Sequence, residues 1–503
     1  MSYLGLDIGT SGCKAVVFSA DGEELSQAHC EYATLMPQPG WAELDSRMVM
    51  RACRGVLAEA AMPWRNQDPV EGIGVSSQGE AFTAVGADGE VLNNAMVSFD
   101  TRAAELSATW SEAFGTERLY ELTGHTAHPM FTIFKLLWIK ENQPQVWRRA
   151  TAFYCFEDLL HHELGVDPAI SYPLAGRTMM FNVSRHEWDD AILRAVDLAP
   201  DRLARPMPSG RLAGTIPDDV CAELGLKPGA AVTTGGHDQP CGALGAGVLQ
   251  SGDAVYGMGT TECITPAFEK PVFSRELCAS NLCTYDHTVA GMYTTVAFSL
   301  TGGNLFRWYR DEWAQKEAEQ AERTGQDVYA LLLESLPEDP TDLLVVPHFT
   351  PTGTPAFDTN PLSAILGAKL STTRQEVLKA LLEGVTMEMK LNVQILEDAG
   401  VDINLFTATG GGARSSTMVQ LKADVLDRPI RTVEVTEAGC LGAAMLARHA
   451  LAGEALGEIA DRWVRPAALI EPDSQRASRY AETFAAYRRL YPALQELRGT
   501  VGV

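Results

Sequence analysis

Hydrophobic and polar positions alternate along the first part of this chain in short segments whose period of two is typical of β-strands. Five segments are therefore predicted as strands: residues 3–8, 13–19, 24–33, 73–76 and 82–85. The turn dipeptide Asp21-Gly22 separates the second strand from the third, and residues 46–61 are expected to form a helix. Strands mixed with helices predict an α/β architecture.

Helical periodicity dominates two later regions. Residues 102–165 are predicted to be mostly helical, with an apolar face at residues 131–139, and we expect them to cap an acceptor site. Further along, Ser371 can cap a helix that runs to about Ala399 and is closed by Gly400. The chain then continues as a strand, a glycine loop and a helix: residues 404–409, 410–416 and on to about Asp427.

A glycine-rich turn between two apolar segments occurs twice. The first copy is Asp7-Ile8-Gly9-Thr10-Ser11, and the second is Gly257-Met258-Gly259-Thr260-Thr261. An isolated turn of this kind is an ordinary hairpin, but two copies with exposed backbone N–H groups can hold a polyphosphate from opposite sides. Asp7 can hold a hydrated Mg²⁺, whereas the second copy has Gly257 at that place. The asymmetry indicates one metal and one reactive centre shared by two related halves.

Two further groups of residues indicate a site that binds a nucleotide and a substrate hydroxyl. Gly410, Gly411 and Gly412 follow a predicted strand and precede a helix, where a nucleoside can approach the backbone, although a closely packed turn explains the same pattern. Asp238 lies where the strand of residues 231–234 meets a helix. Its carboxylate is either an N-cap or the group that accepts the proton of a substrate hydroxyl.

Composition excludes several classes of partner. The 503 residues, 46% of them hydrophobic, are enough for two or more domains with cores of their own. A formal net charge of -25 argues against nucleic acid and against anionic membranes as partners. The ten cysteines have no paired spacing, which disfavours a zinc site and disulfide bonds. The sequence shows neither the pattern of a leader segment nor that of a membrane span. A cytoplasmic location is therefore expected.

Six motifs, in this order along essentially the whole chain, resemble those of the FGGY carbohydrate kinases, which share the fold of actin and heat-shock ATPases. The motifs are Asp7-Ile8-Gly9-Thr10-Ser11 with Lys14, Pro39-Gly40-Trp41-Ala42-Glu43-Leu44-Asp45, Gly236-His237-Asp238-Gln239, Gly257-Met258-Gly259-Thr260-Thr261, Thr301-Gly302-Gly303 and Gly410-Gly411-Gly412-Ala413-Arg414-Ser415. Six motifs in the right order make a chance likeness very rare.

The resemblance implies an α/β fold of two actin-like (ribonuclease H-like) ATPase domains with the active-site cleft between them. The acceptor side is expected in residues 1–245 and the nucleotide side in residues 246–503. The implied reaction transfers the γ-phosphoryl group of ATP to a hydroxyl of a sugar or polyol, with Asp238 as the catalytic base and with Asp7 and Asp238 beside Mg²⁺. The residues implied to bind ATP are Thr10, Ser11, Lys14, Thr260, Thr261, Gly303, Gly411, Gly412 and Ser415.

The resemblance also implies which residues bind the acceptor: Gln78, Glu80, Asp100, Arg102, Asp238 and Gln239. Glu80 with the Asp-Gln pair is similar to the arrangement of glycerol kinases, but Gly79 replaces the arginine and Ser98 the tryptophan expected there. Both changes remove bulk, so we expect an acceptor larger than glycerol. A pentulose such as xylulose is favoured, with another polyol, a hexulose or a sugar acid as alternatives.

Three side chains near this site are open to more than one interpretation. Arg102 can pair with Asp100 or face a sugar acid. For His125 and His128 we expect a surface or structural role rather than a place in the pocket.

Two non-enzymatic functions compete with the kinase hypothesis. The same fold serves ATP-binding proteins without an acceptor sugar, and a degenerate kinase can act as a sugar sensor. The presence of both Asp7 and Asp238 favours the enzyme. Kinases of this type often dimerise, so the resemblance also favours a homodimer.

Overall fold

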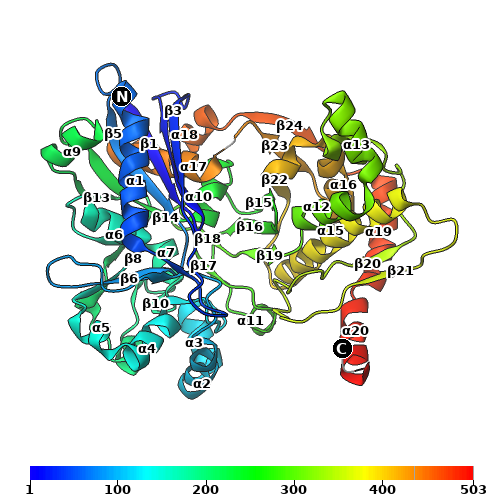
Figure 1. Ribbon diagram of the computed structural model, residues 1–503, viewed down its shortest axis with the longest axis horizontal. Coiled ribbons are helices and arrows are strands. Elements are labelled where there is room, and N and C mark those ends of the chain that lie inside the picture. The colour runs from blue at the N-terminus through cyan, green and yellow to red at the C-terminus, as the bar shows by residue number, and fades with distance from the viewer. Residues whose placement is uncertain (436, 502–503) are drawn as a thin grey trace.

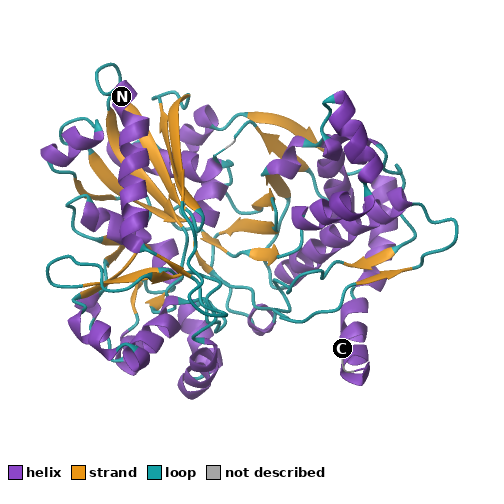
Figure 2. Ribbon diagram, viewed as in Figure 1, coloured by secondary structure: helices purple, strands orange, loops and turns teal. Residues whose placement is uncertain are grey.

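The computed structural model describes residues 1–435 and 437–501, and these form two lobes that are each built around a β-sheet. Figure 1 shows the N-terminal half of the chain in one lobe and most of the C-terminal half in the other. Helices cover the sheets of both lobes (Figure 2). The predicted α/β class is confirmed.

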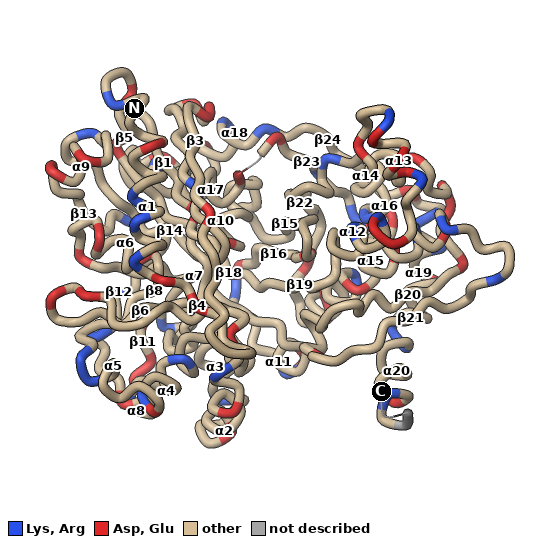
Figure 3. Tube along the Cα trace, viewed as in Figure 1, with Lys and Arg blue, Asp and Glu red and all other residues tan. Residues whose placement is uncertain are grey.

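Charged residues are scattered along the chain in both lobes (Figure 3). Acidic residues outnumber basic ones by 65 to 40, so a basic surface of the kind that binds nucleic acid is not favoured. Within the described part of the chain, no helix is both long enough and apolar enough to cross a membrane.

The first sheet brings three strand ends of the N-terminal lobe to one edge. Strands β1, β5 and β14 run parallel to one another, and β1 forms an antiparallel hairpin with β2. In spatial order the strands are β13 (Leu212–Thr215), β14 (Ala231–His237), β5 (Val70–Ser77), β1 (Ser2–Ile8), β2 (Gly12–Phe18) and β3 (Glu24–Glu31). Because parallel strands share a direction, the residues that follow β1, β5 and β14 meet at the same edge.

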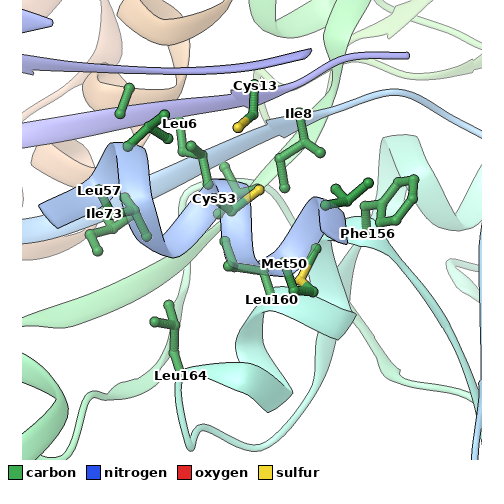
Figure 4. Packing of buried hydrophobic residues seen from close by; sticks show 14 of the residues in the cluster. Leu6, Ile8, Cys13, Met50, Cys53, Leu57, Ile73, Phe156, Leu160 and Leu164 are labelled. Carbon is green, nitrogen blue, oxygen red and sulfur yellow. The ribbon is translucent and has the colours of Figure 1, made fainter. Parts of the chain in front are cut away.

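Helix α1 (Ser46–Ala61) covers one face of this sheet, as the sequence predicts. Asp45 caps its first turn, and its buried face includes Met50, Cys53 and Leu57. Figure 4 shows these side chains between the sheet and a second helix, α6 (Phe156–Glu163), which contributes Phe156 and Leu160. Helix α6 is therefore held in the main core of the lobe.

The second sheet repeats the arrangement of the first. Strands β15 and β16 form an antiparallel hairpin, and β15 also runs parallel to β22, as β1 does to β5. In order the strands are β17 (Tyr285–Asp286), β18 (Tyr293–Thr294), β16 (Glu262–Phe268), β15 (Asp253–Met258), β22 (Leu405–Thr409), β23 (Ile430–Val433) and β24 (Pro466–Ile470), with β19 (Ala297–Ser299) also paired to β16. The duplication inferred from the two glycine-rich turns is confirmed.

Helix α17 (Ala438–Ala452) returns from the second sheet to pack against the first. It meets β1 and β5 so closely that a Cβ atom added to Gly5 would lie 1.8 Å from the Cys440 carbonyl oxygen, and one added to Gly74 would lie 1.9 Å from that of Ala443. Helix α18 (Leu456–Trp463) joins the same apolar cluster. These two helices belong to the predicted C-terminal domain by sequence but to the N-terminal lobe by packing.

The predicted helical region of residues 102–165 is confirmed, with one added strand. It consists of α2 (Ala104–Phe114), α3 (Thr116–Thr123), α4 (Thr132–Asn142), α5 (Pro144–Arg149), β8 (Ala152–Cys155) and α6. Strand β8 pairs with β6 (Phe82–Val85) outside the main sheet. The region therefore extends the N-terminal lobe beside the edge where the parallel strands end.

Both helices predicted for this part of the chain are present, and only the cap of the first differs from the prediction. Helix α15 (Arg374–Asp398) is capped by Thr373, not by Ser371, because Thr373 and Glu376 form a reciprocal capping box. Helix α16 (Ser416–Leu426) follows β22 through the 3₁₀ turn η3 (Gly411–Arg414) and is capped by Ser415. The predicted strand, glycine loop and helix are confirmed.

The remaining elements complete the two lobes: β4 (Glu43–Leu44), η1 (Met62–Trp64), β7 (Ala95–Met96), β9 (Ala169–Ser171), α7 (Tyr172–Gly176), β10 (Phe181–Asn182), β11 (Glu187–Trp188), α8 (Asp190–Val196), η2 (Pro200–Arg202), β12 (Arg205–Met207), α9 (Asp218–Leu224), α10 (Asp238–Gly245), α11 (Arg275–Ala279), α12 (Gly303–Trp313), α13 (Gln315–Thr324), α14 (Val328–Glu334), β20 (Leu344–Val346), β21 (Ala364–Leu366), α19 (Ser474–Tyr487) and α20 (Leu490–Val501).

Candidate active site

Asp7 lies near the end of β1, at the edge where the parallel strands finish. Its Oδ1 accepts a 2.6 Å hydrogen bond from the Ser76 hydroxyl of β5. Burial raises the pKa of Asp7, and the hydrogen bond from Ser76 opposes part of that rise. Gly439, near the start of α17, lies beside this carboxyl group: a Cβ there would make an ordinary contact, 3.4 Å from Asp7 Cγ.

Asp238 is the first residue of helix α10, directly after β14. The N-cap interpretation of this residue is wrong, because His237 occupies the cap position. The Asp238 side chain is 36% exposed, but its Oδ1 atom is buried and makes no hydrogen bond among the described residues. Nε2 of His237 lies 3.2 Å from this oxygen, and burial lowers the pKa of His237, which keeps the ring neutral. Burial, helped by Asp7 and Glu80, raises the pKa of Asp238 to about 7. The structure thus brings the buried Oδ1 atom of Asp238, which makes no hydrogen bond among the described residues, close to the Asp7 carboxylate.

Gln78 contacts the first glycine-rich turn. Its amide group donates to the Gly9 carbonyl at 2.9 Å, and its Oε1 accepts from the Thr10 hydroxyl at 3.2 Å. Gln78 was expected beside the acceptor, but both polar ends of its side chain hold the turn in place. Gln239 reaches the other lobe in a similar way, where its Oε1 accepts from the Cys263 thiol at 3.3 Å.

Lys14 forms an ion pair that sequence analysis did not foresee. Its Nζ lies 2.5 Å from Oε1 of Glu437, the residue directly before α17. Both side chains remain partly exposed. To bind a phosphate as predicted, Lys14 must therefore either leave the Glu437 carboxylate or contact the carboxylate and the phosphate together.

Glu80 is held by an arginine from a distant segment. Arg177, directly after α7, donates from Nε to Glu80 Oε1 at 2.5 Å and forms a second ion-pair contact through Nη2. Burial alone would lower the pKa of Arg177, but the Glu80 carboxylate outweighs this and raises it. Glu80 has a φ of 64°, a left-handed conformation uncommon for a residue with a side chain and often found at functional sites.

The space beside Gly79 is already filled. A Cβ atom added to Gly79 would lie 3.0 Å from His237 Cδ2 and 3.2 Å from Arg177 Cγ. The expectation that glycine at this position enlarges the pocket is wrong, because a different arginine occupies the volume. No local pattern around Arg177 marks it; only the need of Glu80 for a counter-charge could have pointed to such a residue.

A small pocket of ≈ 60 Å³ lies between the two lobes beside Arg177 and His237, and we name it the interdomain pocket. Its other lining residues are His125, Thr126, Met130, Phe131, Asn281, Cys283, Val296, Phe298 and Phe357. His125 is one of these residues, so it lines a pocket and also has the structural contact that was expected. Its Nδ1 lies 2.7 Å from the Thr123 carbonyl, so Nδ1 carries the proton and the buried, unpartnered Nε2 is an acceptor. Burial lowers the pKa of His125 to about 3, which keeps the ring neutral.

His128 has the structural role that was expected. Its Nδ1 accepts the Met130 N–H at 3.2 Å, and its ring packs edge-on against Phe357.

Asp100 and Arg102 form a buried structural cluster and do not line the interdomain pocket. Arg102 binds both oxygens of Asp100 and also Glu43, and its guanidinium lies 3.8 Å from the Trp41 ring centroid. Asp100 also accepts the Ala42 N–H at 2.7 Å. Their contact with the acceptor stays a prediction, whereas the alternative in which Arg102 pairs with Asp100 is confirmed.

A larger pocket of ≈ 810 Å³ lies in the C-terminal lobe, and we name it the C-terminal pocket. Five of the residues predicted to bind ATP line it: Thr260, Gly303, Gly411, Gly412 and Ser415. Of the other four, Thr261 belongs to the same turn as Thr260, and Thr10, Ser11 and Lys14 belong to the opposite lobe. The pocket lies between the second glycine-rich turn and the start of α16, which places a glycine-lined surface beside free helix N–H groups.

A buried ion pair forms part of the wall of the C-terminal pocket. Lys422 of α16 lies 2.8 Å from both carboxylate oxygens of Glu262, which directly follows the second glycine-rich turn. The Tyr256 hydroxyl donates to the same carboxylate at 2.6 Å. Both charged side chains are at most 5% exposed. The pair joins the turn and the helix that form opposite walls of the pocket, and the sequence did not reveal it because the partners are 160 residues apart.

Comparison with known proteins places this geometry in context. Residues 2–245 match the N-terminal domain, and residues 254–451 the C-terminal domain, of the FGGY family of carbohydrate kinases. The chain is 26% identical over 500 residues to a xylulose kinase of Bacillus subtilis (99% of this chain, 98% of the relative) and 29% identical over 493 residues to a glycerol kinase of Symbiobacterium thermophilum (92% of each). A crystal structure of a xyloylose kinase from Brucella ovis superposes with a TM-score of 0.88 at 26% identity, covering 99% of this chain and 100% of that one.

Replacement of Lys422 by methionine should destabilise the C-terminal lobe, because it leaves the Glu262 carboxylate buried without its counter-charge. A loss of about 3–5 kcal/mol is expected in the free energy of unfolding, measured by chemical denaturation. The double variant Glu262→Gln/Lys422→Met, which removes both charges, should recover most of that loss. If Lys422→Met alone unfolds at the same denaturant concentration as the wild type, the pair does not stabilise the pocket.

Proposed function

The chain belongs to the FGGY family of carbohydrate kinases, and we propose that its acceptor is a pentulose such as xylulose. It is an ATP-dependent phosphotransferase with an alcohol group as acceptor, built from two actin-like domains. The proposed substrate is supported by xylulose kinases among its relatives, from Bacillus subtilis and two staphylococcal species.

The unpaired Oδ1 atom of Asp238 is the observation that carries the mechanism. A general base must reach the hydroxyl proton with a free lone pair, and this oxygen makes no hydrogen bond among the described residues, although the neutral His237 ring lies 3.2 Å away. We assign Asp238 the role of accepting that proton as the hydroxyl oxygen bonds to the γ-phosphorus and the bond to the β-phosphate oxygen breaks. Because the transition state is loose, positioning of the two reactants supplies much of the rate.

The C-terminal pocket is the proposed nucleoside site. Gly411, Gly412 and Ser415 would border the nucleoside, and the hydroxyls of Thr260 and Thr261 would reach the phosphates from this lobe. From the opposite lobe, Thr10 and Ser11 would complete the phosphate site, and Lys14 would approach as its pairing with Glu437 loosens. Both turns present backbone N–H groups to the same anion.

Asp7 and Asp238 are the proposed contacts of Mg²⁺. Carboxylate oxygens are the ligands that Mg²⁺ prefers. The negative charge of Asp7 raises the pKa of Asp238, so a cation between the two carboxylates would be favoured. The described residues contain no cluster of three or more His, Cys, Asp or Glu able to hold a metal, so water and phosphate oxygens would complete the shell. The ion would neutralise part of the phosphate charge.

The interdomain pocket is the proposed site for the far end of the acceptor. Its ≈ 60 Å³ holds only a few water molecules, so a pentulose would extend from it toward Asp238. There His125 Nε2 can accept a sugar hydroxyl, and Phe131 and Phe298 can cover the carbon chain. Glu80 already neutralises Arg177, which favours an uncharged acceptor over a sugar acid. A cytoplasmic location and a homodimer remain predictions.

Asp238→Asn should abolish phosphorylation while nucleotide binding persists, because the amide cannot accept the proton. We expect ADP release from Mg·ATP with a panel of pentuloses, hexuloses, polyols and sugar acids to fall by about 10³-fold or more for the preferred acceptor. Titration of Mg·ATP should still show saturable binding, because the proposed nucleoside contacts lie in the C-terminal pocket. A variant as active as the wild type would remove Asp238 from the base role, and a wild type that binds ATP but turns over no acceptor would favour a non-catalytic sugar sensor.

The rate of the kinase should depend on pH through Asp238. Since only the ionised carboxylate accepts a proton and burial raises its pKa to about 7, kcat/KM should fall as the pH drops through this value. Well below this pKa, kcat/KM should fall about tenfold for each pH unit. Thermal unfolding at each pH serves as the control for loss of structure. A profile that stays flat from pH 8 to about 5.5 would place the pKa of the base near that of an ordinary carboxylate.

A further inference from the structure

Glu157 is a buried carboxylate in the N-terminal lobe that no step above uses. It lies in the first turn of α6, and none of its surface is exposed. Phe156 and Leu160 of the same helix are anchored against α1 in the main core (Figure 4). Glu157 is therefore fixed to a rigid part of the lobe.

Three donors from two other segments converge on the Glu157 carboxylate. Its Oε1 accepts the Gly235 N–H at 2.6 Å, and its Oε2 accepts both the Ser171 N–H at 2.7 Å and the Ser171 hydroxyl at 2.8 Å. Hydrogen bonds to a charged acceptor are about twice as strong as those between neutral groups. These contacts hold the ionised form of the side chain, although burial raises its pKa to about 7.

The bond to Gly235 fills a gap in the first sheet. The pairing of β14 with β5 shifts register between Thr233 and Gly236, so Gly235 has no pairing partner on β5. No side chain can fill this place, since a Cβ on Gly235 would lie 1.7 Å from the Val75 carbonyl oxygen. A buried N–H group needs an acceptor, and Glu157 supplies it across the irregularity.

The two anchored segments lead directly to the reacting groups. Gly235 lies near the end of β14, three residues before Asp238. Ser171 directly precedes helix α7, which is followed by Arg177. One carboxylate thus ties the segment that carries the base to the segment that holds Glu80.

We propose that Glu157 is a positioning residue for the phosphoryl transfer, fixing Asp238 and Arg177 relative to one another through its bonds to Gly235 and Ser171. This proposal rests on the proposed function, since it assumes that Asp238 is the base. A displacement of about 1 Å in such a group can reduce the rate by about a hundredfold without affecting the binding of distant substrate groups.

The neighbouring Asp158 offers a matched control. It is equally buried and lies on the same turn of α6, but its hydrogen bond goes to the Cys155 N–H at the start of its own helix. A purely structural effect of losing a buried carboxylate should therefore appear in Asp158→Asn as much as in Glu157→Gln.

The test compares Glu157→Gln with Asp158→Asn in the full-length protein. The amide of Gln can accept at one end only, so its NH₂ group opposes either the Gly235 N–H or the donors of Ser171. We expect kcat for the preferred acceptor to fall about tenfold or more in Glu157→Gln, with KM for ATP unchanged, whereas Asp158→Asn keeps kcat within about threefold of the wild type. Equal kcat values in the two variants, at matched thermal stability, would overturn the proposal.

Two further variants cover the case in which Glu157→Gln does not fold. Glu157→Asp keeps the charge but is too short to reach both segments, and it should show the same selective loss of kcat. Ser171→Ala removes only the hydroxyl donor, and about a threefold fall in kcat is expected from it. If every folded variant of the set matches the wild type, Glu157 has no positioning role.

The failure of the proposed function has a different signature. In that case the wild type turns over no acceptor, and the comparison moves to acceptor-independent hydrolysis of Mg·ATP, in which water would take the place of the acceptor hydroxyl. A selective loss of hydrolysis in Glu157→Gln then supports the positioning role, and equal hydrolysis in both variants contradicts it.

Discussion

The confinement of negative charge at the edge of the first sheet is the constraint on which the rest of the site depends. Asp7, Glu80 and Asp238 meet there because three parallel strands end together. Burial raises the pKa of Asp7 and of Asp238. The three carboxylates have different surroundings: Asp7 accepts the Ser76 hydroxyl, Glu80 pairs with Arg177, and Asp238 Oδ1 makes no hydrogen bond among the described residues. Asp238, whose buried Oδ1 makes no hydrogen bond among the described residues, is the carboxylate proposed to accept the proton.

Close backbone packing fixes helix α17 against this edge of the first sheet. Helix α10, which begins with Asp238, lies against α17 at distances that only glycine permits, since a Cβ on Gly245 would lie 1.9 Å from the Ala438 carbonyl oxygen and one on Gly442 would lie 2.0 Å from that of Cys241. Helix α17 starts beside Asp7, and the residue before it, Glu437, pairs with Lys14. Because α17 packs within the N-terminal lobe, these contacts hold Asp7 and Lys14 on that side of the site, where the phosphates are proposed to bind.

The sequence predicted what local chemistry determines and missed what long-range contacts determine. The duplicated glycine turns, the strand before Asp238 and the loop before Ser415 have local signals, and all are confirmed. Arg177, Glu437 and Lys422 have none, because their partners are 97 to 423 residues away in the chain. For the same reason, the glycine at position 79 suggested open space in the pocket, but the distant Arg177 fills that space. The sequence assigned Asp100 and Arg102 to the acceptor and did not show that Arg102 also binds Glu43.

The central claim is that the site delivers the γ-phosphoryl group of ATP to a sugar hydroxyl and not to water. Phosphorus-31 NMR of the protein with Mg·ATP and xylulose tests this most directly, because it identifies the product that contains the transferred phosphorus. The account predicts a sugar phosphate monoester that grows in equal amount with ADP. Inorganic phosphate as the only product beside ADP, with this and with every other sugar or polyol tried, would contradict it.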